Sequence, residues 1–130
     1  MGQPAAKQDD QVVGVDIHIV MIPSPGGPVP TPLPNPFSGK LDGELSGDVN
    51  IEGKAAATEG STATNSPSHI PSGGNFQNQP DNKGTVKMGS STVFINGKAA
   101  ARAGDTVETC NDPSAAPVGS IIAVGTVFIG

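Results

Sequence analysis

Short apolar segments separated by turn-forming residues run along most of the chain. Residues 85–88 and 92–95, joined by Gly89-Ser90-Ser91, predict a short β-hairpin. Residues 120–129 predict a second copy of this hairpin, and residues 40–51 predict a weaker third. The apolar positions hold 21 Val and Ile against 3 Leu, and β-branched side chains suit a pleated sheet better than a helix. The pattern therefore predicts an all-β protein with almost no helix.

One sequence unit occurs three times. Residues 93–105 match residues 49–61 at an offset of 44, with identical residues at more than half of the positions. Residues 2–10 match the second half of this unit, and residues 126–130 match its first half. Because the two ends of the chain complete one copy between them, we expect the termini to lie side by side.

The three copies account for all 130 residues. This predicts a single domain, 1–130, with repeats at roughly 10–60, 61–104 and 105–130 plus 1–9. Such copies pack most simply around a pseudo-threefold axis, where small Ala side chains after each turn allow close approach. Closure around the axis would also remove exposed strand edges. The expected fold is a cone-shaped prism of β-hairpins with long loops.

Composition limits both the core and the classes of partner. Only 28 residues are Leu, Ile, Val or Phe, against 31 Gly and Pro, which excludes a thick ordinary core. The formal charge is -5 and the chain has no Trp or Tyr. It therefore lacks the cationic surface and stacking rings of nucleic-acid binders, and anionic membranes are poor partners. Residues 1–10 do not read as a secretory signal, and the apolar run 117–129 is too short for a transmembrane helix, so we expect synthesis in the cytoplasm.

Three candidate metal ligands fall one in each repeat. His18 and His69 lie eight residues past the equivalent positions Asp10 and Ser61, and Cys110 lies five residues past the corresponding position of the third repeat. Equivalent positions converge near a threefold axis, so these three residues predict a site for Zn²⁺ or Fe²⁺ near the narrow end. Coordination would replace the apolar core that narrow loops cannot enclose. The alternative is three unrelated side chains, since a free Cys is often a small buried hydrophobe.

Three short elements give the chain a resemblance to a known family. They are the segments Gly2-Gln3-Pro4-Ala5-Ala6-Lys7, Gly53-Lys54-Ala55-Ala56-Ala57 and Gly97-Lys98-Ala99-Ala100-Ala101-Arg102. They look like degenerate copies of a Pro-Ala-Ala-Arg motif, in which only Pro4 keeps the proline and only Arg102 keeps the arginine. The chain thus resembles the PAAR-repeat proteins that tip the spikes of contractile injection systems, including type VI secretion and phage-tail-like particles. Residues 28–37 and 109–113 are similar to the phage-tail-like subgroup.

The resemblance implies a structural role without catalytic residues. It implies a cone whose base caps a trimeric VgrG-like spike and whose point carries zinc and makes transient contact with the target membrane. Effector cargo, a monomeric state in isolation, no nucleic acid, and delivery outside the cell or into the target cell are further implications. The residues that contact the spike stay unknown.

The fourth ligand of the implied zinc site is open. Family sites usually use three His and one Cys, which His18, His69 and Cys110 match in part. Asn35 stands where relatives often carry His, and an amide oxygen is a poor zinc ligand. Asn35, Asp112 or a water molecule are the candidates for this position.

Two other functions are alternatives. A small zinc-dependent hydrolase would use a metal-bound water with Glu108 or Glu59 as general base, but narrow loops offer no concave pocket. A β-repeat adhesion module would need exposed rings, whereas Phe94 and Phe128 share one repeat position, which favours core or base packing. Asp10 and its repeat equivalents follow a turn, which favours hydrogen bonding to the backbone over a catalytic carboxylate pair.

Two further segments have distinctive composition. Pro occupies every second position from Pro28 to Pro36, which forces an extended backbone without ladder donors. We expect a stiff strap wrapped around the cone, with an SH3-type ligand or free linker as alternatives. Residues 65–84, rich in Ser, Asn, Pro and Gly, predict a surface loop that brings His69 to the metal site, with disorder as the alternative away from His69.

Overall fold

The computed structural model describes residues 2–130, and within them every regular element is a β-strand. This confirms the all-β prediction. The described residues contain no helix long and apolar enough to cross a membrane. The strands are β1 (Gln3–Pro4), β2 (Gln11–Ile22), β3 (Val29–Gly43), β4 (Asn50–Ile51), β5 (Lys54–Ala55), β6 (Thr62–Asn65), β7 (Asn75–Phe76), β8 (Lys83–Val86), β9 (Phe94–Ile95), β10 (Lys98–Ala99), β11 (Thr106–Thr109), β12 (Ala116–Ile122) and β13 (Phe128–Ile129).

Six antiparallel strands close into a small barrel in the order β12-β11-β8-β6-β3-β2. The ring closes where β12 pairs with β2, with Ser120 opposite Val13. Closure removes the free edges that a sheet would otherwise expose. The barrel interior holds fully buried apolar side chains, among them Val12, Phe37, Leu41, Val86, Val107 and Ile121.

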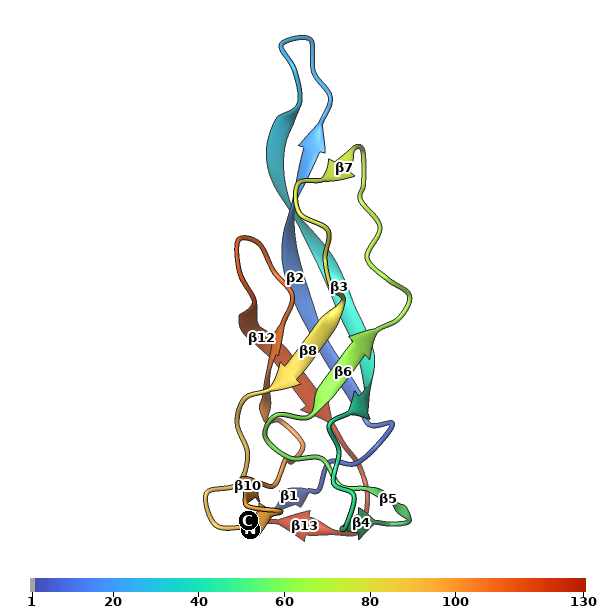
Figure 1. Ribbon diagram of the computed structural model, residues 1–130, viewed down its shortest axis with the longest axis vertical. Helices are drawn as coiled ribbons and strands as arrows, with labels where there is room; N and C mark the ends of the chain where they lie inside the picture. The colour runs from blue at the N-terminus through green and yellow to red at the C-terminus, as the bar shows by residue number, and fades with distance from the viewer. Residues whose placement is uncertain (1) are drawn as a thin grey trace.

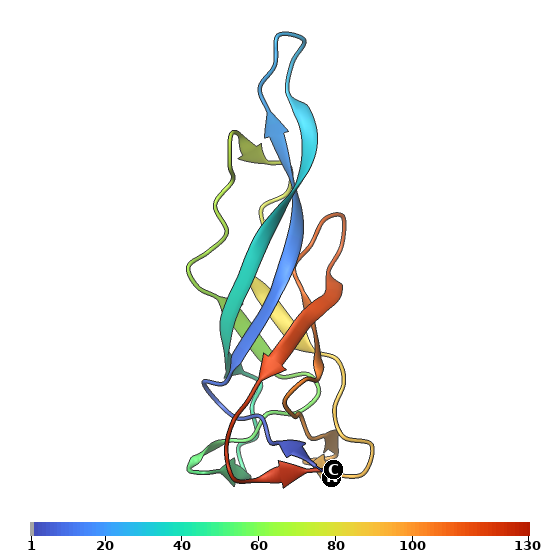
Figure 2. The same ribbon diagram turned by 180° about the vertical axis from the view of Figure 1, so that it is seen from behind.

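Three two-stranded antiparallel sheets form the base of the molecule, below the barrel in Figures 1 and 2. They are β4–β5, β9–β10 and β1–β13. In the last of these, Gln3 lies opposite Ile129, which confirms that the two ends of the chain lie side by side. Equivalent residues Ile51, Ile95 and Ile129 are buried in a second apolar cluster at this base.

A cyclic set of backbone hydrogen bonds joins the three Ala-rich elements. Ala6 N donates to Ala101 O, Ala101 N to Ala57 O, and Ala57 N to Ala6 O, each at 3.0 Å. All three side chains are fully buried, so a larger side chain could not be placed here without separating the backbones. The division of the chain into one domain of three repeats stays a prediction that these hydrogen bonds support.

Each Ala-rich element is followed by a turn with a side-chain cap. The side chain at the same repeat position accepts a hydrogen bond from the backbone N–H three residues earlier, as the sequence predicted for the aspartates. The pairs are Lys7 N to Asp10 Oδ2 at 3.0 Å, Thr58 N to Ser61 Oγ at 2.9 Å and Arg102 N to Asp105 Oδ2 at 2.7 Å.

The predicted pairing of the short hairpins is wrong. β8 pairs with β6 and β11 in the barrel, whereas β9 pairs with β10 in the base. The reason is a two-residue turn in which Asn96 and Gly97 both have positive φ, 54° and 79°, the geometry that favours a tight hairpin. It places Ile95 opposite Lys98, so β9 is no longer available to β8.

The other two predicted hairpins fail in the same way. Residues 120–129 divide between β12, which pairs with β11 and β2, and β13, which pairs with β1. Residues 40–51 divide between β3 in the barrel and β4, which pairs with β5 in the base.

The Pro-rich segment is the upper part of β3 and not a strap around the cone, nor a linker or an isolated ligand for another domain. Residues 29–40 pair continuously with residues 11–22 of β2, and the resulting hairpin extends beyond the barrel (Figures 1 and 2). Each Pro is opposite an odd-numbered residue of β2, as in the pair Ile19 and Pro32. The intervening residues can therefore supply all the ladder hydrogen bonds, which is why alternating Pro is compatible with this strand.

Replacement of Asp105 by Ala tests the turn cap. Asp105 is 7% exposed and also accepts from the Arg102 guanidinium at 2.9 and 3.1 Å. Its loss leaves a shielded N–H without an acceptor, so we expect the free energy of unfolding in urea to fall by about 1–3 kcal/mol. Glu59→Ala removes an exposed carboxylate and should cost less than about 0.5 kcal/mol. Equal losses in the two variants would contradict the capping role.

Candidate metal centre

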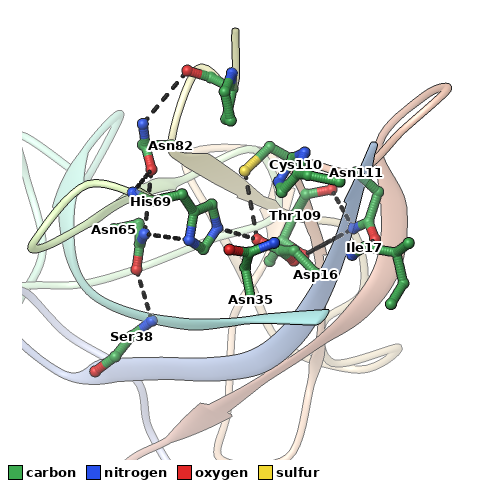
Figure 3. Close-up of polar contacts among 12 residues, drawn as sticks. Asp16, Ile17, Asn35, Ser38, Asn65, His69, Asn82, Thr109, Cys110 and Asn111 are labelled. Carbon is green, nitrogen blue, oxygen red and sulfur yellow. Dashed lines mark hydrogen bonds and ion pairs between the residues drawn. The ribbon is translucent and has the colours of Figure 1, made fainter. Parts of the chain in front are cut away.

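Four side chains capable of binding a metal converge at the end of the barrel from which the β2–β3 hairpin projects. They are Asp16, His18, His69 and Cys110, all buried, with one ligand atom of each within 4.8 Å of the others. The structure thus brings together the three residues singled out in the sequence and adds Asp16. Figure 3 shows Asp16, His69 and Cys110 facing one another.

Three elements position this cluster. Asp16 and His18 lie two residues apart on β2, so they share its inner face. Cys110 directly follows β11, and its backbone N–H donates to Lys83 O at 3.1 Å. His69 comes from the loop between β6 and β7, as expected for a segment that delivers it to the site.

Asp16 is at the centre of the cluster and is fully buried. Its Oδ1 accepts hydrogen bonds from the Thr109 hydroxyl and from Asn111 Nδ2, the latter at 3.2 Å. Its Oδ2 faces His69 Nε2 at 2.8 Å and Cys110 Sγ at 3.4 Å. No Lys or Arg within residues 2–130 forms an ion pair with it. A buried carboxylate without a cationic side chain is costly, so this position favours a bound cation.

Two asparagines hold His69 in place. Asn65 Oδ1 accepts from Ser38 N at 2.8 Å, which turns the Asn65 amide NH₂ toward His69 Nδ1 at 3.2 Å. Asn82 Oδ1 accepts from the backbone N–H of His69 at 2.8 Å. With Nδ1 as acceptor, neutral His69 carries its proton on Nε2, where it faces Asp16. Ligation through Nε2 requires this proton to leave and the Asn65 amide to rotate.

His18 has the clearest unused binding capacity. Its ring is 1% exposed, and neither ring nitrogen has a hydrogen-bond partner. Desolvation by burial, reinforced by His69, lowers the pKa of His18 below its usual 6.5, so the ring stays neutral at physiological pH with a free lone pair. Asp112 Oδ2 lies 3.6 Å from Nδ1 and accepts from Ile19 N at 2.8 Å. An orphaned buried nitrogen of this kind fits a metal ligand.

Burial also controls the thiol. Desolvation, followed by the charge of Asp16, raises the pKa of Cys110 to about 12. The thiol is therefore protonated unless a cation stabilises the thiolate, as a coordinated metal does. Two imidazoles, a thiol and a carboxylate are a donor set that can hold a transition metal.

The expected fourth ligands lie around this group. Asn35 is directly opposite Asp16 in the β2–β3 pairing, as Figure 3 also shows, and its Nδ2 donates to Leu33 O at 3.1 Å. Of the four cluster residues, Asp112 pairs with His18, at 3.6 Å from Nδ1. The sequence analysis missed Asp16 because this residue does not occupy a repeat-equivalent position. Asp16 lies two residues before His18 on a predicted strand, which places both side chains on one face, and this spacing could have identified it.

Two hollows border the cluster. One has a volume of about 180 Å³ and includes His18, Cys110, Asp81 and Asp112 in its lining; the other, of about 320 Å³, includes His69, Asn35 and Asn65. Acidic side chains at the first hollow favour the approach of cations over anions.

A comparison with known protein families identifies the family of this chain. The profile of the PAAR motif family matches residues 20–113 and residues 76–130. The chain belongs to the PAAR family. It is a PAAR-repeat protein of the kind that forms spike tips in contractile injection systems. No curated protein and no solved structure matches it.

The PAAR elements and the candidate metal centre lie at different ends of the molecule. The Ala-rich motifs form the hydrogen-bonded ring above the base, whereas the cluster lies at the far end of the barrel. The PAAR family is a structural family, which agrees with a non-enzymatic role. Neither proposed general base is in the cluster. Glu108 points outward from β11 and pairs with Lys87 at 3.7 Å, and Glu59 follows the ring at the base and is exposed.

Proposed function

We propose that this PAAR protein is the rigid tip of a trimeric VgrG-like spike, with its base as the docking face. The observation that carries this proposal is the ring of three equivalent Ala hydrogen bonds, with the three two-stranded sheets of the base arranged around it. One chain with pseudo-threefold symmetry can present three similar edges to a threefold partner. A closed barrel without free edges suits a part that transmits force without unfolding.

Exposed rings at the base support the choice of docking face. Asn50, Phe94 and Phe128 are equivalent first residues of β4, β9 and β13. Phe94 and Phe128 are 61% and 60% exposed, while the Ile that follows each is buried. The sequence analysis favoured packing of these two rings in the core or at the base. In the structure both rings are exposed, on strands of the base. Exposed aromatic side chains in a cluster are typical of protein interfaces.

Delivery and cargo follow from the same role. PAAR proteins are components of injection particles, so we propose assembly at the particle tip and export with it. Effector docking, a monomeric state in isolation and the lack of nucleic-acid binding stay predictions.

The double variant Phe94→Asp/Phe128→Asp tests the docking face. Loss of two apolar anchors and burial of two carboxylates should weaken binding to the cognate VgrG-like trimer by at least about 100-fold, measured by biolayer interferometry. Val29→Asp replaces an exposed apolar residue at the opposite end and should leave the affinity unchanged. Binding that survives the double change would contradict docking through the base.

We also propose that His18, His69 and Cys110 bind Zn²⁺ or Fe²⁺, with Asp16 as the fourth ligand in preference to Asn35, Asp112 or water. Three features support this assignment: the unpartnered His18 nitrogens, the buried Asp16 carboxylate and the position of Cys110 Sγ 3.4 Å from Asp16 Oδ2. A metal would link β2, the His69 loop and the end of β11, and so stabilise the narrow end where few apolar side chains pack.

Elemental analysis and metal titration test this assignment. Purified protein should contain about one zinc or iron per chain, and Co²⁺ should give the visible absorption of a tetrahedral site with sulfur. Cys110→Ser and His18→Ala should lose the metal, and removing it by chelation should lower the melting temperature. Asp16→Asn should lower metal affinity at least about tenfold, whereas Asn35→Ala and Asp112→Asn should change it less. The opposite order would assign the fourth position to one of those residues.

A further inference from the structure

The carboxylate of Asp16 receives two hydrogen bonds from residues that are not themselves candidate ligands. The Thr109 hydroxyl and Asn111 Nδ2 both donate to Oδ1, the second at 3.2 Å. Thr109 is the last residue of β11 and is fully buried, and Asn111 lies two residues further along the chain. Both donors are neutral, so they leave the negative charge of Asp16 to be balanced by a cation.

Oδ2, the other oxygen of Asp16, faces the candidate ligands (Figure 3). It lies 2.8 Å from His69 Nε2 and 3.4 Å from Cys110 Sγ. The χ2 torsion of an Asp side chain is broad, so packing alone leaves the plane of the carboxylate loosely defined. Rotation about this torsion would lengthen both hydrogen bonds to Oδ1. The donors from Thr109 and Asn111 therefore fix the carboxylate with one oxygen directed toward the cluster.

The Asn111 amide is held in one orientation. Its Oδ1 accepts from Ile17 N at 2.7 Å, and its Nδ2 donates to Thr109 O at 3.2 Å as well as to Asp16. Exchange of the amide oxygen and nitrogen would place two donors, or two acceptors, against each other at these contacts. Ile17 directly follows Asp16 on β2, and Cys110 directly precedes Asn111. The amide thus links the two segments that carry these candidate ligands and leaves Asp16 Oδ2 and Cys110 Sγ available.

We propose that Thr109 and Asn111 are positioning residues, which hold Asp16 so that its Oδ2 can bind the metal ion. The inference rests on the proposed metal site, to which it adds two side chains that do not touch the ion. Hydrogen bonds to a ligating carboxylate set its direction, and the loss of one such outer contact lowers metal affinity by about 10–100-fold. A carboxylate that is already fixed also loses less conformational freedom when the ion binds.

The pair Thr109→Val and Thr109→Ser separates positioning from packing. Val retains the shape of Thr without the hydroxyl donor, whereas Ser retains the donor without the methyl group, which lies against Gly84 and Gly119. In titrations of the full chain with Co²⁺ against a competing chelator, Thr109→Val should lower the affinity at least about tenfold and shift the visible absorption bands. Thr109→Ser should leave both unchanged. The opposite order, or equal results for the two variants, would overturn the positioning role of Thr109.

Asn111→Ala, with Asn96→Ala as its control, provides the second readout. Asn111→Ala should weaken Co²⁺ binding and alter the spectrum in the same way as Thr109→Val. Asn96 makes comparable side-chain hydrogen bonds at the base, with Ser46 Oγ at 2.6 Å and Asp48 Oδ2 at 2.7 Å. Asn96→Ala should therefore lower the melting temperature without either change. An Asn111→Ala spectrum like that of the unmodified chain, or equal effects of both Asn variants, would overturn the positioning role of Asn111.

The outcomes distinguish these positioning roles from the proposed metal site itself. Unchanged Co²⁺ binding in all of these variants removes only the positioning roles, because the unmodified chain still binds the ion. An unmodified chain that binds neither Co²⁺ nor Zn²⁺ removes the metal site and the positioning roles together.

Discussion

The structure depends on one cyclic constraint: three backbone segments meet at an axis and donate hydrogen bonds to one another in turn. Because Ala6, Ala57 and Ala101 have almost no side chain, the three backbones approach closely enough for N–H to O distances of 3.0 Å. The segment that holds Ala6 is fixed to the C-terminal end of the chain by the pairing of β1 with β13 and by the hydrogen bond from Ala5 N to Val127 O at 2.9 Å. Closure of the base, burial of its three Ile side chains and the positions of the three capped turns all follow from this contact.

The two ends of the barrel bury different kinds of side chain. At the base, three equivalent two-stranded sheets bury enough aliphatic surface to form a small apolar cluster. At the other end the strands separate and the buried groups are polar, with Asp16, His18, His69 and Cys110 in place of a core. Hydrogen bonds from Thr109 and Asn111 satisfy one oxygen of Asp16, but His18 keeps two unpartnered nitrogens. We infer that a metal ion supplies there the cohesion that apolar packing supplies at the base.

The repeat made the closed fold and the convergence of the cluster predictable. Matching of the two ends of the chain placed the termini together, and the phase of His18, His69 and Cys110 placed them near one point. Strand partners were less predictable, because the apolar pattern alone does not distinguish the connection 87–93, between β8 and β9, from the tight turn at Asn96 and Gly97. The Pro-rich segment was misplaced for a related reason. Alternating Pro removes hydrogen-bond donors from only one edge of a strand. The pairing of the other edge with β2 depends on tertiary contacts, which the local sequence does not show.

The proposed function assigns a different task to each pole: the base binds the spike, and the end with the metal centre and the β2–β3 hairpin leads. The most direct test is a cryo-electron microscopy structure of the full-length protein bound to its cognate VgrG-like trimer, determined without imposed symmetry. We predict one PAAR chain per trimer, with Phe94 and Phe128 against the blunt end of the spike and the β2–β3 hairpin pointing away along the axis. Several chains per trimer, or a chain seated on the spike through that hairpin, would contradict the account.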